Sequence, residues 1–249
     1  MSRLALLAFG VLAYLCFLAS VGAGIDYVAG AGILRGLDAP SAVAVPAAIA
    51  IDVALLALFG ITHTVMARPG FKRRWTQVVP TAAERSVYVL VASLCLGLTF
   101  WQWRALPDPI WNVTTAGPRT ALWALAAGGA ALVVWSSFLT SHVDLFGLRQ
   151  VWLAARGLPY EPVPFRQRAI YRLVRHPMML GFLIAFRATP TMTWDHALFA
   201  AVMSAYIAIG IRFEERDLER QFGDAYRRYR GEVPAVIPFL NLRRSPDRG

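Results

Sequence analysis

The chain has 249 residues, of which 57% are hydrophobic, and its mean hydropathy is +0.49. A soluble domain is closer to half apolar, so these values exclude an ordinary soluble fold and indicate an integral membrane protein. The formal net charge is +10, but the basic residues lie between apolar segments, which favours membrane orientation and contact with anionic lipid over nucleic-acid binding.

An apolar run from Leu4 to about Gly24 opens the chain. Because Arg3 precedes it and small residues follow near Ala23, a cleaved signal peptide is one interpretation. The run is longer than the apolar core of a usual signal peptide and fits a spanning helix of about 20 residues. We therefore predict a first spanning helix here; cleavage would leave five crossings instead of six.

Five further apolar stretches follow along the chain. Three are predicted to span the membrane as single helices, Ser41–Met66, Ser86–Trp103 and Thr120–Ser141. The last two, Met178–Ala188 and His196–Arg212, predict a helical hairpin with a short first helix and a turn at Thr189–Asp195. The predicted fold class is an all-α polytopic membrane helix bundle with five to six membrane helices.

Basic residues are distributed unevenly among the connecting segments. The loops on one side carry only Arg35, Arg104 and Arg119, and the other side carries most of the remaining arginines and Lys72. The positive-inside rule assigns the basic side, including both termini, to the cytoplasm.

Two polar segments are predicted to lie in the cytoplasm. Prolines interrupt any long helix in Asp144–Arg175. Glu214–Arg230 is predicted to continue the last helix into water, with apolar residues at helical spacing: Leu218 with Phe222, and Tyr226 with Tyr229. We treat residues 1–249 as one membrane domain, with an N-terminal four-helix part at 1–141 and a C-terminal part at 142–249.

The sequence Arg175-His176-Pro177 begins the predicted hairpin. Pro177 is favourable in the first turn of a helix and biases His176 away from helical geometry. Gly181 follows one turn later and leaves space where a backbone or a ligand could approach. The arginines alone are better explained as a basic membrane anchor, which is common beside spanning helices.

Glu214 and Glu215 are adjacent acids near the predicted inner end of the last membrane helix. The C-terminal end of a helix prefers cations, and no i,i+4 partner accounts for both acids. A ligand with ammonium, hydroxyl or sulfonium groups would account for them.

Three motifs in this part of the chain together resemble the C-terminal core of the isoprenylcysteine carboxyl methyltransferase superfamily, namely Arg175–Gly181, Glu214–Leu218 and Phe222–Tyr229. Upstream stretches are similar to the bacterial methanethiol S-methyltransferases and their NnrU-like relatives: His63–Phe71, Ala83–Leu90 and Asp144–Trp152. The resemblance covers most of the chain from about residue 50. It implies an enzyme of the bacterial inner membrane that methylates methanethiol to dimethyl sulfide, with hydrogen sulfide as a second substrate.

The resemblance also implies S-adenosylmethionine as the cofactor, bound on the cytoplasmic side. The residues expected to border it are Tyr171, Val174, Arg175, His176, Met179, Gly181, Glu214 and Glu215. Arg175 is expected to face the cofactor carboxylate, and the two glutamates its ammonium or ribose hydroxyls. Met179 departs from the superfamily, which usually has an aromatic residue at this position.

The thiol needs a base, because the thiolate is the nucleophile. His63 and His142 are predicted to lie at a depth similar to that of His176, and either could be the catalytic base or orient the substrate. Each is equally explained as a packed core histidine. His196 is predicted on the far side, in a structural role. Metal-ligand spacing is absent, so no metal is predicted.

Arg187 lies within the predicted hairpin, where an unpaired charge is costly. Two hypotheses explain it: the side chain extends toward the membrane surface, or it pairs with Asp52.

Two other functions remain open from the sequence. The same scaffold could methylate another acceptor, such as an isoprenylcysteine carboxylate or a phospholipid amine. The chain could also be a non-catalytic membrane protein of the NnrU-like type. The expected partners are the thiol and the lipid bilayer, with no nucleic acid and no prediction of oligomeric state.

Overall fold

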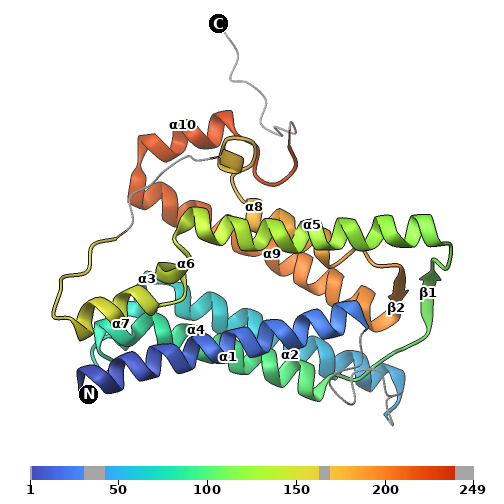
Figure 1. The fold of residues 1–249 in the computed structure, drawn as a ribbon, viewed down its shortest axis with the longest axis horizontal. Helices are drawn as coiled ribbons and strands as arrows, with labels where there is room; N and C mark the ends of the chain where they lie inside the picture. The colour runs from blue at the N-terminus through green and yellow to red at the C-terminus, as the bar shows by residue number, and fades with distance from the viewer. Residues whose placement is uncertain (1, 31–42, 163–168, 239–249) are drawn as a thin grey trace, which may run out of the picture.

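A computed structural model describes residues 2–30, 43–162 and 169–238. Within them, five helices are long and apolar enough to cross a membrane: α1 (Arg3–Ala29), α2 (Val45–Ala67), α4 (Thr81–Gln102), α5 (Ala116–Thr140) and α9 (Trp194–Phe222) (Figure 1). The predicted all-α membrane bundle is confirmed. The ends of these helices differ by a few residues from the ends predicted for the apolar spans. The exception is α9, which extends well beyond Arg212. Ser41, the predicted start of the second span, lies outside the described residues.

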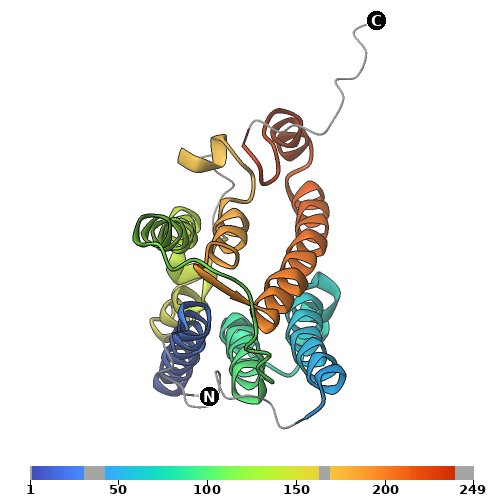
Figure 2. The same cartoon turned by 90° about the vertical axis from the view of Figure 1, so that its right-hand side faces the viewer.

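The helices form two layers (Figure 2). In one layer α4 packs between α1 and α2, and in the other α8 (Pro177–Ala185) packs between α5 and α9. Contact between α9 and α2 joins the layers. An aromatic and aliphatic cluster contributed by α1, α2, α4 and α9 fills part of the interior: Tyr27, Leu56, Phe59, Phe100, Trp103, Phe199 and Met203.

The shorter helices lie at the end of the bundle where α2 and α5 end, which we call the arginine-rich end (Figure 1). They are α3 (Pro69–Trp75), α6 (His142–Leu145), α7 (Leu148–Ala155), the 3-10 helix η1 (Ala169–Arg172) and α10 (Asp224–Glu232). In the described part of Asp144–Arg175 no helix is longer than the eight residues of α7, as the prolines predict.

Two short strands at the opposite end were not predicted. β1 (Pro109–Asn112) pairs antiparallel with β2 (Thr191–Thr193), and the N–H of Val113 donates to the carbonyl of Pro190 over 2.8 Å. β2 lies in the predicted turn of the hairpin, so the hairpin of α8 and α9 is confirmed. With nine residues, α8 is only about 14 Å long and does not span a bilayer core by itself.

Two glycines bring α5 and α8 into backbone contact. A Cβ on Gly181 would lie 2.6 Å from the carbonyl oxygen of Gly129 and 3.0 Å from the backbone nitrogen of Val133. A Cβ on Gly129 would lie 2.8 Å from the Gly181 carbonyl oxygen. Small residues permit this close approach of membrane helices, so Gly181 faces α5 and allows α8 to pack directly against it.

We expect Gly181→Ala to lower the melting temperature of the detergent-purified protein, because the added methyl group pushes α8 away from α5. Alanine is otherwise favoured over glycine in a helix by about 1 kcal/mol. Gly97→Ala in α4 is the matched control, since a Cβ there would meet nothing within 4 Å. Equal melting temperatures for the two variants would contradict the packing role.

The structure shows that the hypothesis of an Arg187–Asp52 pair is wrong. The Arg187 guanidinium donates to Ser204 Oγ at 2.6 Å and to the Leu183 carbonyl at 3.3 Å. Asp52 Oδ1 instead accepts from the backbone N–H of Arg104 at 2.9 Å. A hydroxyl one helix away therefore satisfies Arg187, which remains exposed at the end of α8.

The prediction of one continuous helix over Glu214–Arg230 is also wrong. Helix α9 ends at Phe222, and Gly223 adopts φ 55° and ψ −130° before α10 begins at Asp224. A positive φ is strained for residues with a Cβ, so glycine permits the break. The predicted apolar face persists across the break, because Tyr226, Tyr229 and Val233 pack against Leu218 and Phe222.

Candidate active site

The Arg175-His176 segment is held in place by the end of the described chain. The backbone N–H groups of Arg175 and His176 donate to the carbonyls of Pro234 and Ala235, both at 2.9 Å. Val174, immediately before them, is fully buried. The chain after α10 therefore returns to lie beside the start of α8 and fixes the backbone from which both side chains project.

Glu215 lies at the centre of a buried cluster of charges. Its Oε1 accepts from Arg175 Nε at 2.8 Å and lies 3.2 Å from His176 Nε2. Its Oε2 lies 3.1 Å from Arg230 Nε. Because the carboxylate is 7% exposed, hydrogen-bonded cations are needed to stabilise its charge there.

Glu214 extends the cluster toward solvent. Its side chain is 48% exposed, and its Oε2 lies 3.3 Å from His176 Nδ1. Both ring nitrogens of His176 therefore face carboxylates. Burial alone lowers the pKa of His176, but hydrogen bonds and charges of Glu214 and Glu215 outweigh it and raise the pKa to about 9. His176 is thus an imidazolium at neutral pH and is not available as a base.

The pKa of His176 predicts a pH dependence. Since its folded-state pKa of about 9 exceeds the reference value of 6.5, its stabilising contribution is complete below about pH 6.5 and is lost as the pH rises through 9. We expect the melting temperature to fall between pH 7 and 10 and His176→Gln to flatten that profile. Cysteines, tyrosines and the N-terminal amine also titrate in this window, so the difference between wild type and His176→Gln, and not the fall itself, tests the contribution of His176. If the melting temperature of His176→Gln falls with pH as steeply as that of the wild type, the raised pKa of His176 is refuted.

Arg175 is directed into the protein. Its side chain is 8% exposed, and besides Glu215 its guanidinium donates to the backbone carbonyls of Arg230 and Val233. Arg230 also pairs with Glu219. The sequence did not indicate Arg230 or Glu219, because the break at Gly223 that turns α10 back over α9 was not predicted.

The other four residues expected to border the cofactor surround this cluster. Tyr171 in η1 hydrogen-bonds through its hydroxyl to Thr140 Oγ1 at 2.9 Å, at the end of α5, and its carbonyl accepts from Tyr229 at 2.6 Å. Val174 is buried beneath the segment. Met179 is half-buried in the first turn of α8, and Gly181 is buried against α5.

His63 lies near the arginine-rich end of α2 among aromatic rings. Its ring centroid is 4.9 Å from that of Tyr88, 5.3 Å from that of Phe59 and 6.2 Å from that of Tyr206. Its Nδ1 is buried and has no hydrogen-bond partner among the described residues. An imidazole nitrogen without a partner is free to form a hydrogen bond with a small polar group such as a thiol.

His142 has both ring nitrogens occupied. Nε2 lies 2.7 Å from Tyr14 Oη and Nδ1 lies 2.8 Å from Ser137 Oγ. Ser141, with φ 88°, makes the sharp turn between α5 and α6 that brings the ring back onto Phe138, whose ring centroid is 4.6 Å away. Burial lowers the pKa of His142. Its geometry is that of a histidine joining α1 to α5.

His196 lies at the opposite end, where its Nε2 is 3.0 Å from the Phe186 carbonyl oxygen, in keeping with a structural role. In the described parts of the chain, no three His, Cys, Asp or Glu side chains form a group that could hold a metal ion.

The sequence model of the family described as "NnrU protein" matches residues 53–217. The chain belongs to the NnrU family. This family match includes His63, the Arg175-His176 segment and both glutamates of the cluster, and it ends before α10.

Several known proteins are similar to the chain, two of those named here over nearly their whole length. A "Methanethiol S-methyltransferase" of Mycobacterium tuberculosis is 47% identical over 96% of this chain and 98% of its own. "Methanethiol S-methyltransferase 2" of Bradyrhizobium diazoefficiens is 43% identical over 99% and 95%. The rat protein "Nurim" is 29% identical over 69% and 68%. No solved structure matches the chain.

Proposed function

We propose that this protein is a methanethiol S-methyltransferase that uses S-adenosylmethionine. The observation that carries the proposal is the charge cluster of Arg175, His176, Glu214 and Glu215, in a chain that is 47% identical to a protein of that name. The reaction would move the methyl group from the sulfonium of S-adenosylmethionine to the sulfur of methanethiol, giving dimethyl sulfide, S-adenosylhomocysteine and the released thiol proton. Hydrogen sulfide is proposed as a second acceptor.

The residues of the cluster fit the chemistry of this cofactor. S-adenosylmethionine supplies an activated methyl group on a cationic sulfonium centre and also carries an ammonium group and ribose hydroxyls. Glu214 is half exposed and, among the residues that the structure describes, has an ion-pair contact only with His176, so its carboxylate can accept from such groups. We therefore assign Glu214 to direct contact, with Tyr171, Val174 and Met179 bordering the same space.

Arg175, His176 and Glu215 are proposed to position Glu214. The Arg175 guanidinium is engaged by Glu215 and two backbone carbonyls, which argues against the expected contact with the cofactor carboxylate. His176 presents one nitrogen to each glutamate, so it holds both acids in one arrangement. Gly181 is proposed to act through the contact of α8 with α5.

The proton of the thiol is proposed to pass to His63. A thiol is mostly protonated at neutral pH and reacts as the thiolate, so a base within reach accelerates transfer. Nδ1 of His63 lacks a partner among the described residues, and the surrounding rings of Phe59, Tyr88 and Tyr206 provide an apolar surface for a methyl group. We propose that His142 holds α1 and α5 together at this end.

The arginine-rich end is proposed to face the bacterial cytoplasm, where S-adenosylmethionine is made. The charge distribution supports this orientation through the positive-inside rule. It puts the cluster at the cytoplasmic surface of the inner membrane.

The test is direct production of dimethyl sulfide. Detergent-purified protein is given methanethiol and S-adenosylmethionine, and the headspace is analysed by gas chromatography, with omission of each reactant as a control. We expect dimethyl sulfide only in the complete mixture. Binding of S-adenosylmethionine without dimethyl sulfide would refute methanethiol as acceptor and favour another methyl acceptor. Absence of binding would refute the enzyme and favour a non-catalytic membrane protein.

A further inference from the structure

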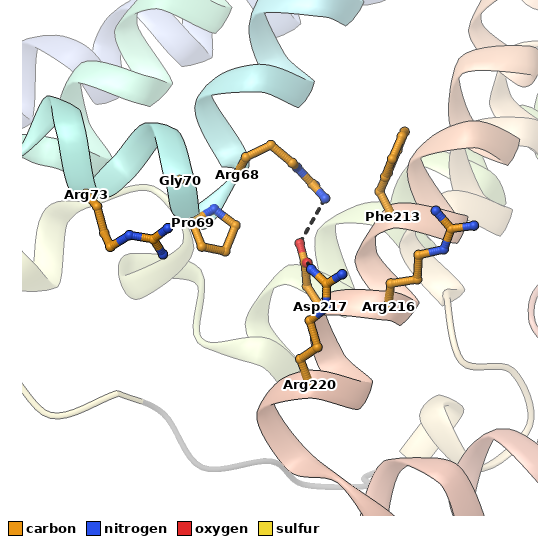
Figure 3. A pocket seen from close by; sticks show the side chains of 8 residues that line it. All are labelled: Arg68, Pro69, Gly70, Arg73, Phe213, Arg216, Asp217 and Arg220. Atoms are coloured by element: carbon orange, nitrogen blue, oxygen red, sulfur yellow. Dashed lines mark ion pairs between the residues drawn. The ribbon is translucent and has the colours of Figure 1, made fainter.

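A second polar site lies on the opposite side of α9 from Glu215. A cavity of about 360 Å³ opens between the beginning of α3 and the last turns of α9 (Figure 3). This volume is in the range of small-ligand sites. Phe213, Arg216, Asp217 and Arg220 line it with helical spacing, and Arg68 and Arg73 face them from the α2–α3 corner.

The lining has a strong excess of positive charge. Four arginines and one aspartate give a formal charge of +3. Asp217 is shared, because its Oδ2 lies 2.9 Å from Arg68 Nη1 and its Oδ1 lies 3.5 Å from Arg220 Nη1. Within the described residues, the guanidinium groups of Arg73 and Arg216 have no carboxylate partner. Gathering like charges is unfavourable unless an anion joins them.

The kind of anion follows from the side chains and their place in the fold. Guanidinium groups bind phosphate oxygens through paired hydrogen bonds. Arg68 directly follows Ala67, the last residue of the apolar span α2, and stacks over the Phe213 ring at 5.1 Å. The cavity thus begins where the apolar part of the bundle ends, and basic pockets between helices at this depth bind anionic lipid headgroups.

We propose that this cavity binds the phosphate group of an anionic phospholipid. The bound headgroup lies among these arginines, between α3 and α9, and so ties the α2–α3 corner to the helix that carries Glu214 and Glu215. A free phosphate ion has the same chemistry, and the experiment separates the two sources.

The experiment measures lipid binding to the full-length protein in detergent by native mass spectrometry, with phosphatidylglycerol, phosphatidylcholine and inorganic phosphate as probes. The double variant Arg73→Gln/Arg216→Gln is compared with Arg227→Gln/Arg228→Gln. Each double variant loses two positive charges, but Arg227 and Arg228 are exposed on α10 and do not line the cavity. Melting temperatures verify that each variant is folded, and Arg216→Gln alone replaces the double variant if that one is unstable.

We expect phosphatidylglycerol to bind the cavity variant about 25-fold more weakly than wild type, or roughly fivefold for each arginine, and the α10 variant to bind normally. Phosphatidylcholine should bind weakly to all three, and millimolar inorganic phosphate should not displace phosphatidylglycerol. Equal losses in both variants would overturn the proposal, since nonspecific charge would then explain binding. Displacement of phosphatidylglycerol by inorganic phosphate would show that the cavity takes a free phosphate ion and not a lipid headgroup.

Discussion

Glu215→Gln is expected to abolish S-adenosylmethionine binding and also to destabilise the protein. The substitution removes the charge of the one carboxylate that contacts all three of Arg175, His176 and Arg230 within the described residues, where that carboxylate is 7% exposed. Removing one member of a buried ion pair costs about 3–5 kcal/mol. We expect a fall of about 6 °C or more in melting temperature, and no measurable cofactor binding by isothermal titration calorimetry.

Substitutions of two nearby glutamates distinguish an effect on cofactor binding from an effect on protein stability. Glu214→Gln should weaken cofactor binding at nearly unchanged melting temperature, because this side chain is 48% exposed and, in the described part of the chain, forms an ion pair only with His176. Glu219→Gln should preserve cofactor binding. Glu219 lies one helical turn after Glu215 and, among the described residues, pairs only with Arg230. Normal cofactor affinity in Glu214→Gln would contradict direct contact. Normal melting and binding in Glu215→Gln would remove the cluster from the mechanism.

His63→Ala is expected to lower kcat for methanethiol by about 100-fold or more while cofactor affinity stays at the wild-type value, since general bases contribute about 10²–10⁴-fold. The rate of the variant should rise with pH between 7 and 8.5 more steeply than that of the wild type, because hydroxide replaces the missing base as more thiol ionises. If His63 has only a structural role, the rate of His63→Ala will not recover in this way as the pH rises. The measurement is steady-state formation of dimethyl sulfide, with calorimetry for the cofactor.

His142→Ala is the matched comparison for His63→Ala. It removes an imidazole near the same end of the bundle but one that bridges Tyr14 and Ser137. We expect a lower melting temperature and a smaller loss of kcat that does not recover with pH. The reverse pattern, with recovery only in His142→Ala, would transfer the role of base to His142.

The membrane helices were predictable from the sequence because the cost of burying polar groups in lipid requires long apolar runs. Arg187 and Gly223 show the limit of that reasoning. Hydropathy indicates that Arg187 needs a partner, but Ser204 becomes its neighbour only through the packing of α8 against α9. The apolar spacing from Leu218 to Tyr229 continues across Gly223, so periodicity alone gave no sign of the break.

At the candidate site, the family resemblance implied that Arg175-His176 and Glu214-Glu215 border one cofactor, and the structure brings the two motifs into contact. Their arrangement was not predictable. Arg175 was expected to face a ligand, but Glu215 and the carbonyls of Arg230 and Val233 take its donors. Those carbonyls come from α10 and the residue after it, and no local pattern shows that this segment returns to the hairpin.

The return of the last described residues to Arg175 and His176 has a consequence for biosynthesis. All five long spans end by Phe222, whereas the carbonyls of Val233, Pro234 and Ala235 that hold this segment come later in the chain. Chains are made from the N-terminus, so membrane insertion can be complete before the site closes. A nascent chain released at Gly223 would retain all five described long spans while the candidate site stayed unformed.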